Sequence, residues 1–399
     1  MNVELLAPAG NFSKLKTALY FGADAAYAGG KNFSLRSFAD NFSREEMTKA
    51  AEYAHSYDKK LYVTANIFAR NYDFCELEDY FVFLEGIGVD GAIISDPGAV
   101  YIAAKAAPRL DIHISTQANI TNKYSVKFWQ EQGAKRCVLA RELSLEEIAE
   151  IHSFVPDMQL EAFVHGAMCI SYSGRCLLSD YLANRSSNRG ACAQPCRWQY
   201  TIRKRDALSD SGELELCEDE RGAYILNSKD LNMSAYLAEM QQAGVCSFKI
   251  EGRMKSEYYL ATVINAYRRC MDFGYTDAVE KELGAAAHRD YTTAYALGKN
   301  SGTVNYSDSQ AKGDCEYIGN VLGFKDGFAQ VEMRGRFFAG DELEVLSPTQ
   351  NFGKSFTVGR VFDSNGEAVS DCKRVQEKYL VECPYALSRG DILRRRRIS

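Results

Sequence analysis

The sequence lacks several features that would place it in particular classes of protein. No run of 18 apolar residues occurs, so we expect no helix that crosses a membrane. The chain starts Met-Asn-Val-Glu without a charged and then apolar leader, and we therefore expect a cytoplasmic protein with reduced thiols. No His-Glu-x-x-His occurs either, which excludes the helix-borne zinc site of many metallopeptidases.

Four cysteines lie close together in the middle of the chain. Cys169, Cys176, Cys192 and Cys196 fall within 28 residues in the spacing C-x6-C-x15-C-x3-C, with Gly and Ser between them. Four thiolates on a loop bind either zinc or an iron–sulfur cluster. Zinc ribbons usually carry two close cysteine pairs, which C-x6-C does not match. The spacing therefore favours iron–sulfur and leaves zinc as the alternative.

Other interpretations of these cysteines are weaker. Disulfides are disfavoured in a chain that we expect to be cytoplasmic. Buried core thiols are disfavoured because the neighbours are Ser, Gly, Arg, Gln and Pro rather than a periodic apolar face. Cys217 is the alternative to Cys196 as the fourth ligand.

The first part of the chain alternates short apolar runs with amphipathic segments. A length of 399 residues favours two domains, and 46% hydrophobic with 25% charged residues is typical of a soluble globular protein. One amphipathic segment starts with a predicted capping box, Ser144 and Glu147. Strands are expected at Val3–Ala7, Ala25–Ala28, Lys60–Ala65, Gly91–Ser95, Asp111–Ser115, Arg136–Ala140, Gln159–His165 and Cys246–Glu251. Eight strands in βα alternation predict an α/β fold with a (β/α)8-type barrel.

Active sites of such barrels lie at the C-terminal ends of the strands, and polar side chains of this sequence fall there. They include Arg36, Asn66, Gln117, Arg141, His165, Lys249, Glu251 and Arg253. Any one of them alone is explained equally well by a turn or a helix cap. We predict an active site because all of these residues are expected to meet at one barrel mouth.

Residues 167–245 form a long insertion between strands seven and eight and contain the four cysteines. Loops of this length are usually functional, so we expect the insertion to cap the barrel mouth. From Cys169 to Arg205 it carries seven basic residues and one acidic residue, Asp180, on a chain of net charge −6. This basic patch suits a phosphate-rich substrate, with a solvated loop as the alternative. Trp198 and Tyr200 are candidates for stacking on an unpaired base, with core packing as the alternative.

The composition changes after a connector at residues 276–312. Short β-rich runs separated by Lys-Asp-Gly, Arg-Gly and Ser-Asn-Gly turns predict a small antiparallel β-barrel at 313–399, beside a catalytic domain at 1–275. Small barrels often bind RNA, and Arg394–Arg397 adds four consecutive cations. We therefore expect RNA binding here, although a run of arginines at a chain end is as often disordered.

Several motifs resemble those of the collagenase-like peptidase family. The run Glu161-x-Phe-x-x-Gly-Ala-Met-Cys169-x4-Gly-x-Cys176-x-Leu-Ser179 is similar to the family signature. The resemblance continues through Leu6–Asn11, Phe33–Arg36, Ser115–Asn119, Asn227–Leu231 and Lys249–Arg253. Better understood members resemble iron–sulfur hydroxylases more than proteases. The chain length and the Cys192-x3-Cys196 pair look most like the tRNA-modifying branch of the family.

The resemblance implies an enzyme that hydroxylates the wobble uridine in the anticodon loop of tRNA to 5-hydroxyuridine, with prephenate as the hydroxyl donor. It also implies that the four clustered cysteines ligate a 4Fe-4S cluster, with zinc as the alternative. A dianionic donor needs fixed cations, and Arg36, Arg141, Arg253 and Lys249 are the candidates. Catalytic roles are predicted for His165, Arg141 and Glu251, and substrate binding for Arg36, Asn66, Gln117, Lys249 and Arg253.

Two functions of other classes stay open. A cysteine or metallo-peptidase, as the family name suggests, would use His165 and Cys169 as base and nucleophile. Four clustered cysteines exceed what such a one-thiol mechanism needs. The other function is that of a non-catalytic RNA-binding protein with a structural zinc.

Overall fold

The computed structural model describes residues 3–35, 40–198, 218–219, 222–223, 227–298, 303–304 and 311–397. The chain forms two compact units. The first comprises Met1–Leu15, Asp24–Met254 and Arg289–Ala311, and the second comprises Lys16–Ala23, Lys255–His288 and Lys312–Ser399. The domain boundaries expected from the sequence, after residues 275 and 312, stay a prediction.

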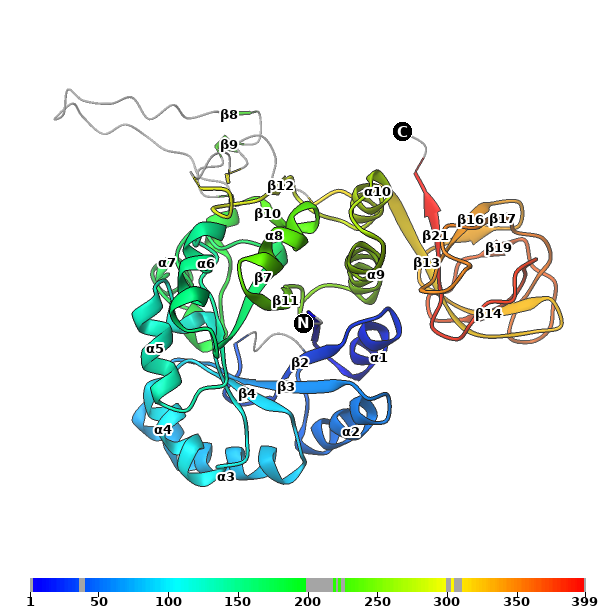
Figure 1. The fold of residues 1–399 in the computed structure, drawn as a ribbon. Helices are drawn as coiled ribbons and strands as arrows, with labels where there is room; N and C mark the ends of the chain where they lie inside the picture. The colour runs from blue at the N-terminus through cyan, green and yellow to red at the C-terminus, as the bar shows by residue number, and fades with distance from the viewer. Residues whose placement is uncertain are drawn as a thin grey trace. The chain divides into compact units, whose positions relative to one another are not determined.

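The first unit is built around a closed barrel of eight parallel strands (Figure 1). In order around the barrel they are β1 (Glu4–Ala9), β2 (Ala25–Gly29), β3 (Lys60–Ala65), β4 (Gly91–Ile94), β5 (Ile112–Ile114), β6 (Arg136–Val138), β7 (Gln159–Ala167) and β11 (Val245–Ile250). β11 pairs in parallel with both β1 and β7, which closes the sheet. The strands are short and almost entirely buried, as parallel strands covered on both faces must be. The predicted barrel is confirmed.

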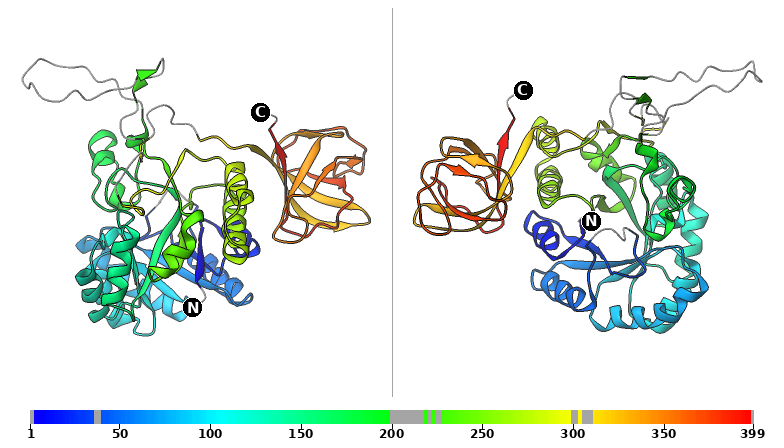
Figure 2. Two further views of the ribbon diagram at one scale, coloured as in Figure 1. Left: turned by 45° about the horizontal axis from the view of Figure 1, so that its top comes forward. Right: turned by 180° about the vertical axis from the view of Figure 1, so that it is seen from behind.

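Helices of the first unit lie outside the strands (Figures 1 and 2). They are α2 (Arg44–His55), α3 (Phe74–Gly86), α4 (Pro97–Ala106), α5 (Lys123–Glu131) and α6 (Leu145–Phe154), and α1 (Phe12–Tyr20) follows β1 in sequence. The predicted capping box is confirmed, because Ser144 Oγ accepts from the Glu147 amide at 3.2 Å and the Glu147 carboxylate accepts from the Ser144 amide at 2.8 Å. Across the described residues, no helix has the length and apolar character needed to span a membrane.

The insertion leaves the barrel at the end of β7 and returns beside the same strand. Its described elements are α7 (Leu178–Ala183), η3 (Ser187–Arg189), η4 (Pro195–Arg197), β8 (Glu218–Asp219), β9 (Gly222–Ala223), β10 (Asp230–Asn232), η5 (Ser234–Tyr236) and α8 (Leu237–Gln242). β10 runs antiparallel to β7, with Asp230 opposite Ala167. β12 (Tyr291–Thr292) extends this edge, and the buried Arg289 donates from Nε to Asp230 Oδ1 at 3.1 Å. Both the start of the insertion and its strand β10 are therefore anchored at β7.

The second unit combines α9 (Glu257–Phe273) and α10 (Asp277–Ala285) with a seven-stranded antiparallel sheet. The sheet order is β17 (Ser355–Thr357), β16 (Glu342–Leu346), β21 (Ile392–Arg396), β13 (Cys315–Lys325), β14 (Phe328–Met333), β20 (Lys378–Glu382) and β18 (Val361–Phe362). β15 (Phe337–Phe338) pairs with β19 (Asp371–Cys372). Asp326 and Gly327, with φ of 51° and 83°, form the two-residue turn between β13 and β14. The predicted antiparallel β domain is confirmed.

The arginine run at the end of the second unit is not the free cationic tail that the sequence suggested. Residues 394–396 belong to β21. Arg394 is fully buried and forms ion pairs with Glu282 of α10 and Glu344 of β16, and the two arginines that follow it also pair with carboxylates. Residues 313–399 carry 13 basic and 13 acidic residues. This part of the chain therefore has no excess of positive charge for binding phosphates.

Candidate active site at the barrel mouth

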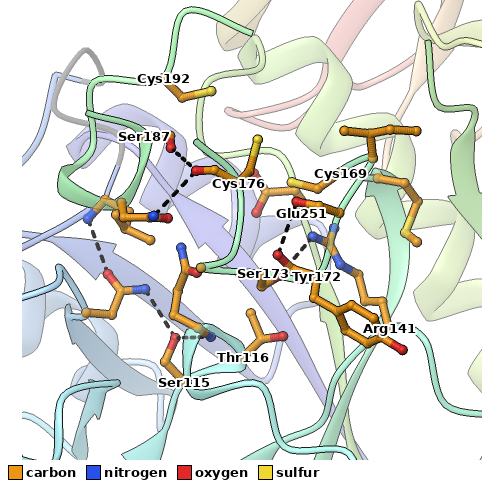
Figure 3. Close-up of a pocket in the computed structure, with 18 of the residues that line it drawn as sticks. Ser115, Thr116, Arg141, Cys169, Tyr172, Ser173, Cys176, Ser187, Cys192 and Glu251 are labelled. Atoms are coloured by element: carbon orange, nitrogen blue, oxygen red, sulfur yellow. Dashed lines mark hydrogen bonds between the residues drawn. The ribbon is translucent and has the colours of Figure 1, made fainter. Parts of the chain in front are cut away.

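A pocket opens at the barrel mouth, where the C-terminal ends of the strands meet (Figure 3). Residues far apart in the sequence converge there, as this fold leads one to expect. Of the predicted site residues, its lining contains Asn66, Gln117, Arg141, Cys169, Cys176, Cys192, Cys196, Lys249, Glu251 and Arg253. Arg36 lies outside the described residues, and His165 is not part of the lining.

The four cysteines are free thiols that share this pocket. Cys169 is exposed and the other three are half-buried. Burial raises the pKa of the Cys196 thiol, the neighbouring Arg197 partly offsets this, and the charges of the other three cysteines raise it again. The other three thiols therefore lie within electrostatic reach of Cys196. Cys217, the alternative fourth ligand, lies outside the described residues.

The four thiols are candidate ligands for a zinc ion or for an iron–sulfur cluster. A tetrahedral zinc with Zn–S bonds of about 2.3 Å needs sulfurs about 3.8 Å apart. In the part of the chain that the structure describes, no three Cys, His, Asp or Glu side chains converge closely enough to hold one metal ion. Four thiolates are a donor set that both zinc and a 4Fe-4S cluster accept, and in the cluster each thiolate binds a different iron. The Gln194 amide donates to Cys192 Sγ at 3.3 Å, a type of hydrogen bond that tunes cluster potentials.

Hydrogen bonds hold the cysteine segment in one shape. Ser187 Oγ donates to the Cys176 carbonyl at 2.8 Å. The Ala193 amide donates to Ser179 Oγ at 2.9 Å, and the Ser179 side chain is buried. These contacts tie the region of the first two cysteines to the region of the last two. The thiols are therefore presented from a connected scaffold rather than from independent loops.

Lys249 lies at the pocket wall next to a buried charge network. Its Nζ donates to Glu161 Oε1 at 2.7 Å, and Arg136 Nη1 donates to Glu161 Oε2 at 3.0 Å and to Glu4 Oε1 at 2.6 Å. Burial lowers the pKa of His113 to about 3, so this neighbour is neutral. Burial alone would raise the pKa of Glu161, but the charges of Lys249 and Arg136 outweigh it and lower that pKa. Glu161 therefore stays ionised and fixes the Lys249 ammonium at the pocket.

Arg253 supplies a second buried cation to the pocket. Its Nη1 donates to Ser34 Oγ at 2.8 Å and to Thr64 Oγ1 at 3.0 Å, and both acceptors are neutral. A Cβ at position 29 would lie 2.5 Å from Arg253 Nη1, so Gly29 leaves the space that the guanidinium occupies. Together with Lys249, this residue gives the pocket wall two fixed positive charges.

Two amide side chains in the lining differ in what they contact. Asn66 Nδ2 donates to Ser115 Oγ at 3.3 Å, and its Oδ1 accepts from the Leu35 amide at 3.2 Å, so both of its ends are occupied. Gln117 Oε1 is buried and, among the described residues, has no hydrogen-bond partner. A buried acceptor without a partner is unfavourable by itself and is available to a ligand.

His165 lies on the side of β7 that faces away from the pocket. Where β7 pairs with β11, Lys249 is opposite Phe163 and Ile250 is opposite His165, so β7 carries one extra residue as a bulge. Side chains alternate along a strand, and the bulge therefore turns His165 outward with Ile250 while Phe163 and Lys249 line the pocket. The His165 ring instead contacts Tyr291, with 5.4 Å between ring centroids. Its predicted role in proton handling stays a prediction.

The basic patch of the insertion is partly used to hold the loop. Outside the described residues lie Tyr200, Arg203, Lys204 and Arg205. Arg189 pairs with Asp73 at 2.8 Å, and Arg185 Nε donates to a backbone carbonyl of the loop at 2.9 Å. Arg175 is exposed and Arg197 lines the pocket. These last two arginines are the cations of the described patch that are best placed to meet a ligand.

Some lining residues had no role in the sequence-based prediction. Tyr27 lies inside β2, and its hydroxyl donates to Glu251 Oε2 at 3.2 Å. The only signal for this residue in the sequence was the alternation of side chains along the strand. Tyr172 is 47% exposed and lies between the first two cysteines, where an aromatic residue within the motif was the available signal. Ser187 and Asn188 carried no signal in the sequence.

Fold and site together define a class of protein, a (β/α)8 barrel whose mouth is lined by cations and by a four-cysteine insertion. A sequence profile of Peptidase family U32 matches residues 10–305, and the profile of the Peptidase family U32 C-terminal domain matches residues 314–394. The chain therefore belongs to peptidase family U32.

Relatives of this chain include proteins named for tRNA hydroxylation and one named collagenase. The chain is 40% identical over 379 residues to "tRNA hydroxylation protein P1" of Bacillus subtilis, a match that covers 91% of this chain and 87% of the relative. It is 36% identical over 414 residues to "tRNA hydroxylation protein P" of Escherichia coli, covering 92% and 90%. A "Collagenase" of Porphyromonas gingivalis is 33% identical over 377 residues, covering 88% of each chain.

Proposed function

We propose that this chain hydroxylates carbon 5 of the wobble uridine of tRNA to give 5-hydroxyuridine, with prephenate as the hydroxyl donor. The observation that carries the proposal is the pocket, which combines four thiols with several cations at a barrel mouth. Relatives that match nearly the whole chain and are named tRNA hydroxylation proteins support the same reaction.

The cofactor of this proposal is a 4Fe-4S cluster held by Cys169, Cys176, Cys192 and Cys196. When bound, such a cluster supplies a redox-active iron centre at the pocket wall. The donor set supports it, because four free thiols line one pocket.

A dianionic donor suits the charges of the pocket. Lys249 and Arg253 are both buried at its wall, where a carboxylate would meet them with little screening by water. Glu161 holds the Lys249 ammonium in place. Gln117 adds an amide whose Oε1 is available to a hydroxyl or amide donor of the ligand. These side chains would bind and orient the donor beside the thiols.

An anticodon base suits the rim of the same pocket. A wobble uridine is unpaired and reaches a recessed site without the breaking of a duplex. Arg175 and Arg197 would contact phosphates, and the exposed ring of Tyr172 offers a surface for stacking. Because residues 313–399 carry no net charge, we assign the electrostatic part of tRNA binding to the insertion.

Peptide hydrolysis is the second candidate, because one relative is named collagenase. A thiol mechanism would need a base beside Cys169. His165 was the candidate base, and the bulge in β7 turns it away from the pocket that Cys169 lines. This placement favours hydroxylation over a Cys169–His165 peptidase.

Deletion of the gene followed by mass spectrometry of tRNA nucleosides tests the proposed reaction. We expect 5-hydroxyuridine and its derivatives to disappear, and to return with the wild-type gene but not with Cys196→Ala. Normal levels in a deletion strain without a second copy would show that the substrate is wrong. Release of peptides from gelatin by wild-type protein, but not by Cys169→Ala, would favour the peptidase.

A metal analysis of protein purified without oxygen tests the cofactor. We expect about four iron atoms per chain and a broad visible absorbance, as for a thiolate-ligated 4Fe-4S cluster. A single zinc per chain without visible absorbance would contradict the cluster.

A further inference from the structure

Arg141 follows β6 and reaches across to the start of the cysteine segment. Its Nη1 donates to the Ala167 carbonyl at 2.8 Å. Its Nη2 donates to Ser173 Oγ at 3.3 Å (Figure 3). The guanidinium also lies over the Phe163 ring, 5.1 Å from its centroid. One side chain therefore contacts the end of β7 and the turn that follows it.

The two acceptors lie on either side of Cys169 in the sequence. Ala167 precedes this cysteine by two residues, and Ser173 lies between it and Cys176. The next residue, Gly174, has φ +78°, and a Cβ there would lie 2.8 Å from the Gln117 carbonyl oxygen. The turn from Cys169 to Cys176 is thus held by Arg141 and packs closely against the loop after β5.

The charge of Arg141 is not cancelled by these contacts. Both acceptors are neutral, and within the described chain no carboxylate forms an ion pair with Arg141. The guanidinium also lines the pocket that Lys249 and Arg253 share. Arg141 therefore contacts the turn that carries two of the proposed thiolate ligands and also lines the pocket proposed for a carboxylate donor.

We propose that Arg141 is a positioning residue that couples the cysteine turn to the donor pocket, so that a bound donor and a bound cluster stabilise each other. The proposal rests on the proposed function, which supplies both ligands. An anion in the pocket fixes the guanidinium, and the fixed guanidinium holds the turn that carries Cys169 and Cys176. Linkage requires this effect to be reciprocal: the donor slows the loss of the cluster, and the cluster tightens binding of the donor.

The test is the rate at which a chelator removes iron from the full chain, measured with and without prephenate. Wild type is compared with Arg141→Gln, Arg141→Lys and Ser173→Ala. Arg175→Gln is the matched control, because it removes the same charge from the turn that Arg141 contacts and, in the described chain, breaks no side-chain hydrogen bond or ion pair. Thermal melting checks that each variant is folded.

We expect prephenate to slow iron release from wild type and from Arg175→Gln. Arg141→Gln should release iron about tenfold faster without prephenate, as expected for the loss of charge-assisted hydrogen bonds worth about 1.4 kcal/mol, and should lose the response to prephenate. Ser173→Ala should release iron faster by a smaller factor and keep the response. Arg141→Lys should be intermediate, because an ammonium reaches only one of the two acceptors well.

A second readout uses protein without metal. We expect Arg141→Gln to raise the alkylation rate of Cys169 and Cys176 more than that of Cys192 and Cys196, because only the first pair lies on the turn that Arg141 contacts directly. Equal alkylation rates in wild type and variant, or iron release from wild type that does not respond to prephenate, would overturn the coupling. If the gene deletion still abolished 5-hydroxyuridine, such a result would reject the role of Arg141 and leave the proposed reaction intact.

Discussion

Replacing the buried Glu161 by Gln should destabilise the barrel more than replacing an exposed glutamate by glutamine. Glu161 is fully buried and contacts Lys249 Nζ at 2.7 Å and Arg136 Nη1 at 3.0 Å. Glutamine keeps the shape and removes the charge. Of the two cations, Arg136 would then keep the carboxylate of Glu4. The variant leaves Lys249 as a buried charge without its anion.

The expected magnitude follows from the cost of breaking a buried ion pair, about 3–5 kcal/mol. For a unit of this size, 1 kcal/mol shifts the melting temperature by roughly 2–4 °C. We therefore expect Glu161→Gln to melt about 10 °C lower than wild type. The matched control is Glu150→Gln, whose carboxylate is exposed and pairs with the partly exposed Lys123. Surface pairs contribute about 0–1 kcal/mol, so this control should shift the melting temperature by no more than about 4 °C.

The same prediction fixes how the difference in melting temperature between wild type and Glu161→Gln changes with pH. The pKa of Glu161 is lower in the folded state than the unfolded value of about 4.3, so its charge contributes stability that is fully present above that value. The contribution is lost as the pH falls through the lower, folded pKa. The gap in melting temperature between wild type and Glu161→Gln should therefore be widest near pH 7 and shrink below about pH 4. Equal melting of both proteins at pH 7 would refute the role of this network.

Three further predictions concern the cysteines, the second unit and the pocket rim. Replacing any one of the four pocket cysteines by Ala should remove most of the iron, whereas Cys270→Ala, in α9, should keep it; metal analysis of purified protein decides. Arg394→Met leaves Glu282 and Glu344 buried without their shared cation and should destabilise the second unit by about 3–5 kcal/mol, measured by urea unfolding at a constant m-value. Tyr172→Ala should raise the KM for tRNA roughly tenfold, because stacking on one base contributes about 1–3 kcal/mol. Tyr172→Phe should stay close to wild type, since stacking needs only the ring. Equal KM values for the two variants would contradict a stacking role.

The barrel could be predicted because its signal is local. Buried parallel strands appear as short apolar runs, and capping residues such as Ser144 mark the helix starts between them. The rule that strand ends form the site then placed Asn66, Lys249 and Arg253 together without knowledge of any contact. The cysteines were found for a related reason, because their clustering is visible in the sequence itself.

The partners of charged residues could not be predicted in this way. Arg394 appears in the sequence as one of four consecutive arginines, which is typical of a solvated tail. Its partners, Glu282 and Glu344, are more than 40 residues away and lie on other elements of the second unit. The same holds for Arg189, whose partner Asp73 follows β3. Composition reports how many charges a segment has, whereas pairing depends on a fold that brings distant carboxylates to them.

The bulge in β7 decides which chemistry faces the pocket, and it is the clearest example of a feature that periodicity misses. By simple alternation after Phe163, the side chain of His165 would point inward. The extra residue in β7 turns this imidazole outward, and Gly166, with φ +108°, then passes so close to β11 that a Cβ would lie 2.4 Å from the Glu251 carbonyl oxygen. The chain is thereby directed over the barrel mouth, and the next side chain with reactive chemistry at the pocket is Cys169. Because of the bulge, Cys169 lines the pocket and His165 does not. This arrangement suits a site built on cysteine ligands rather than on a histidine base.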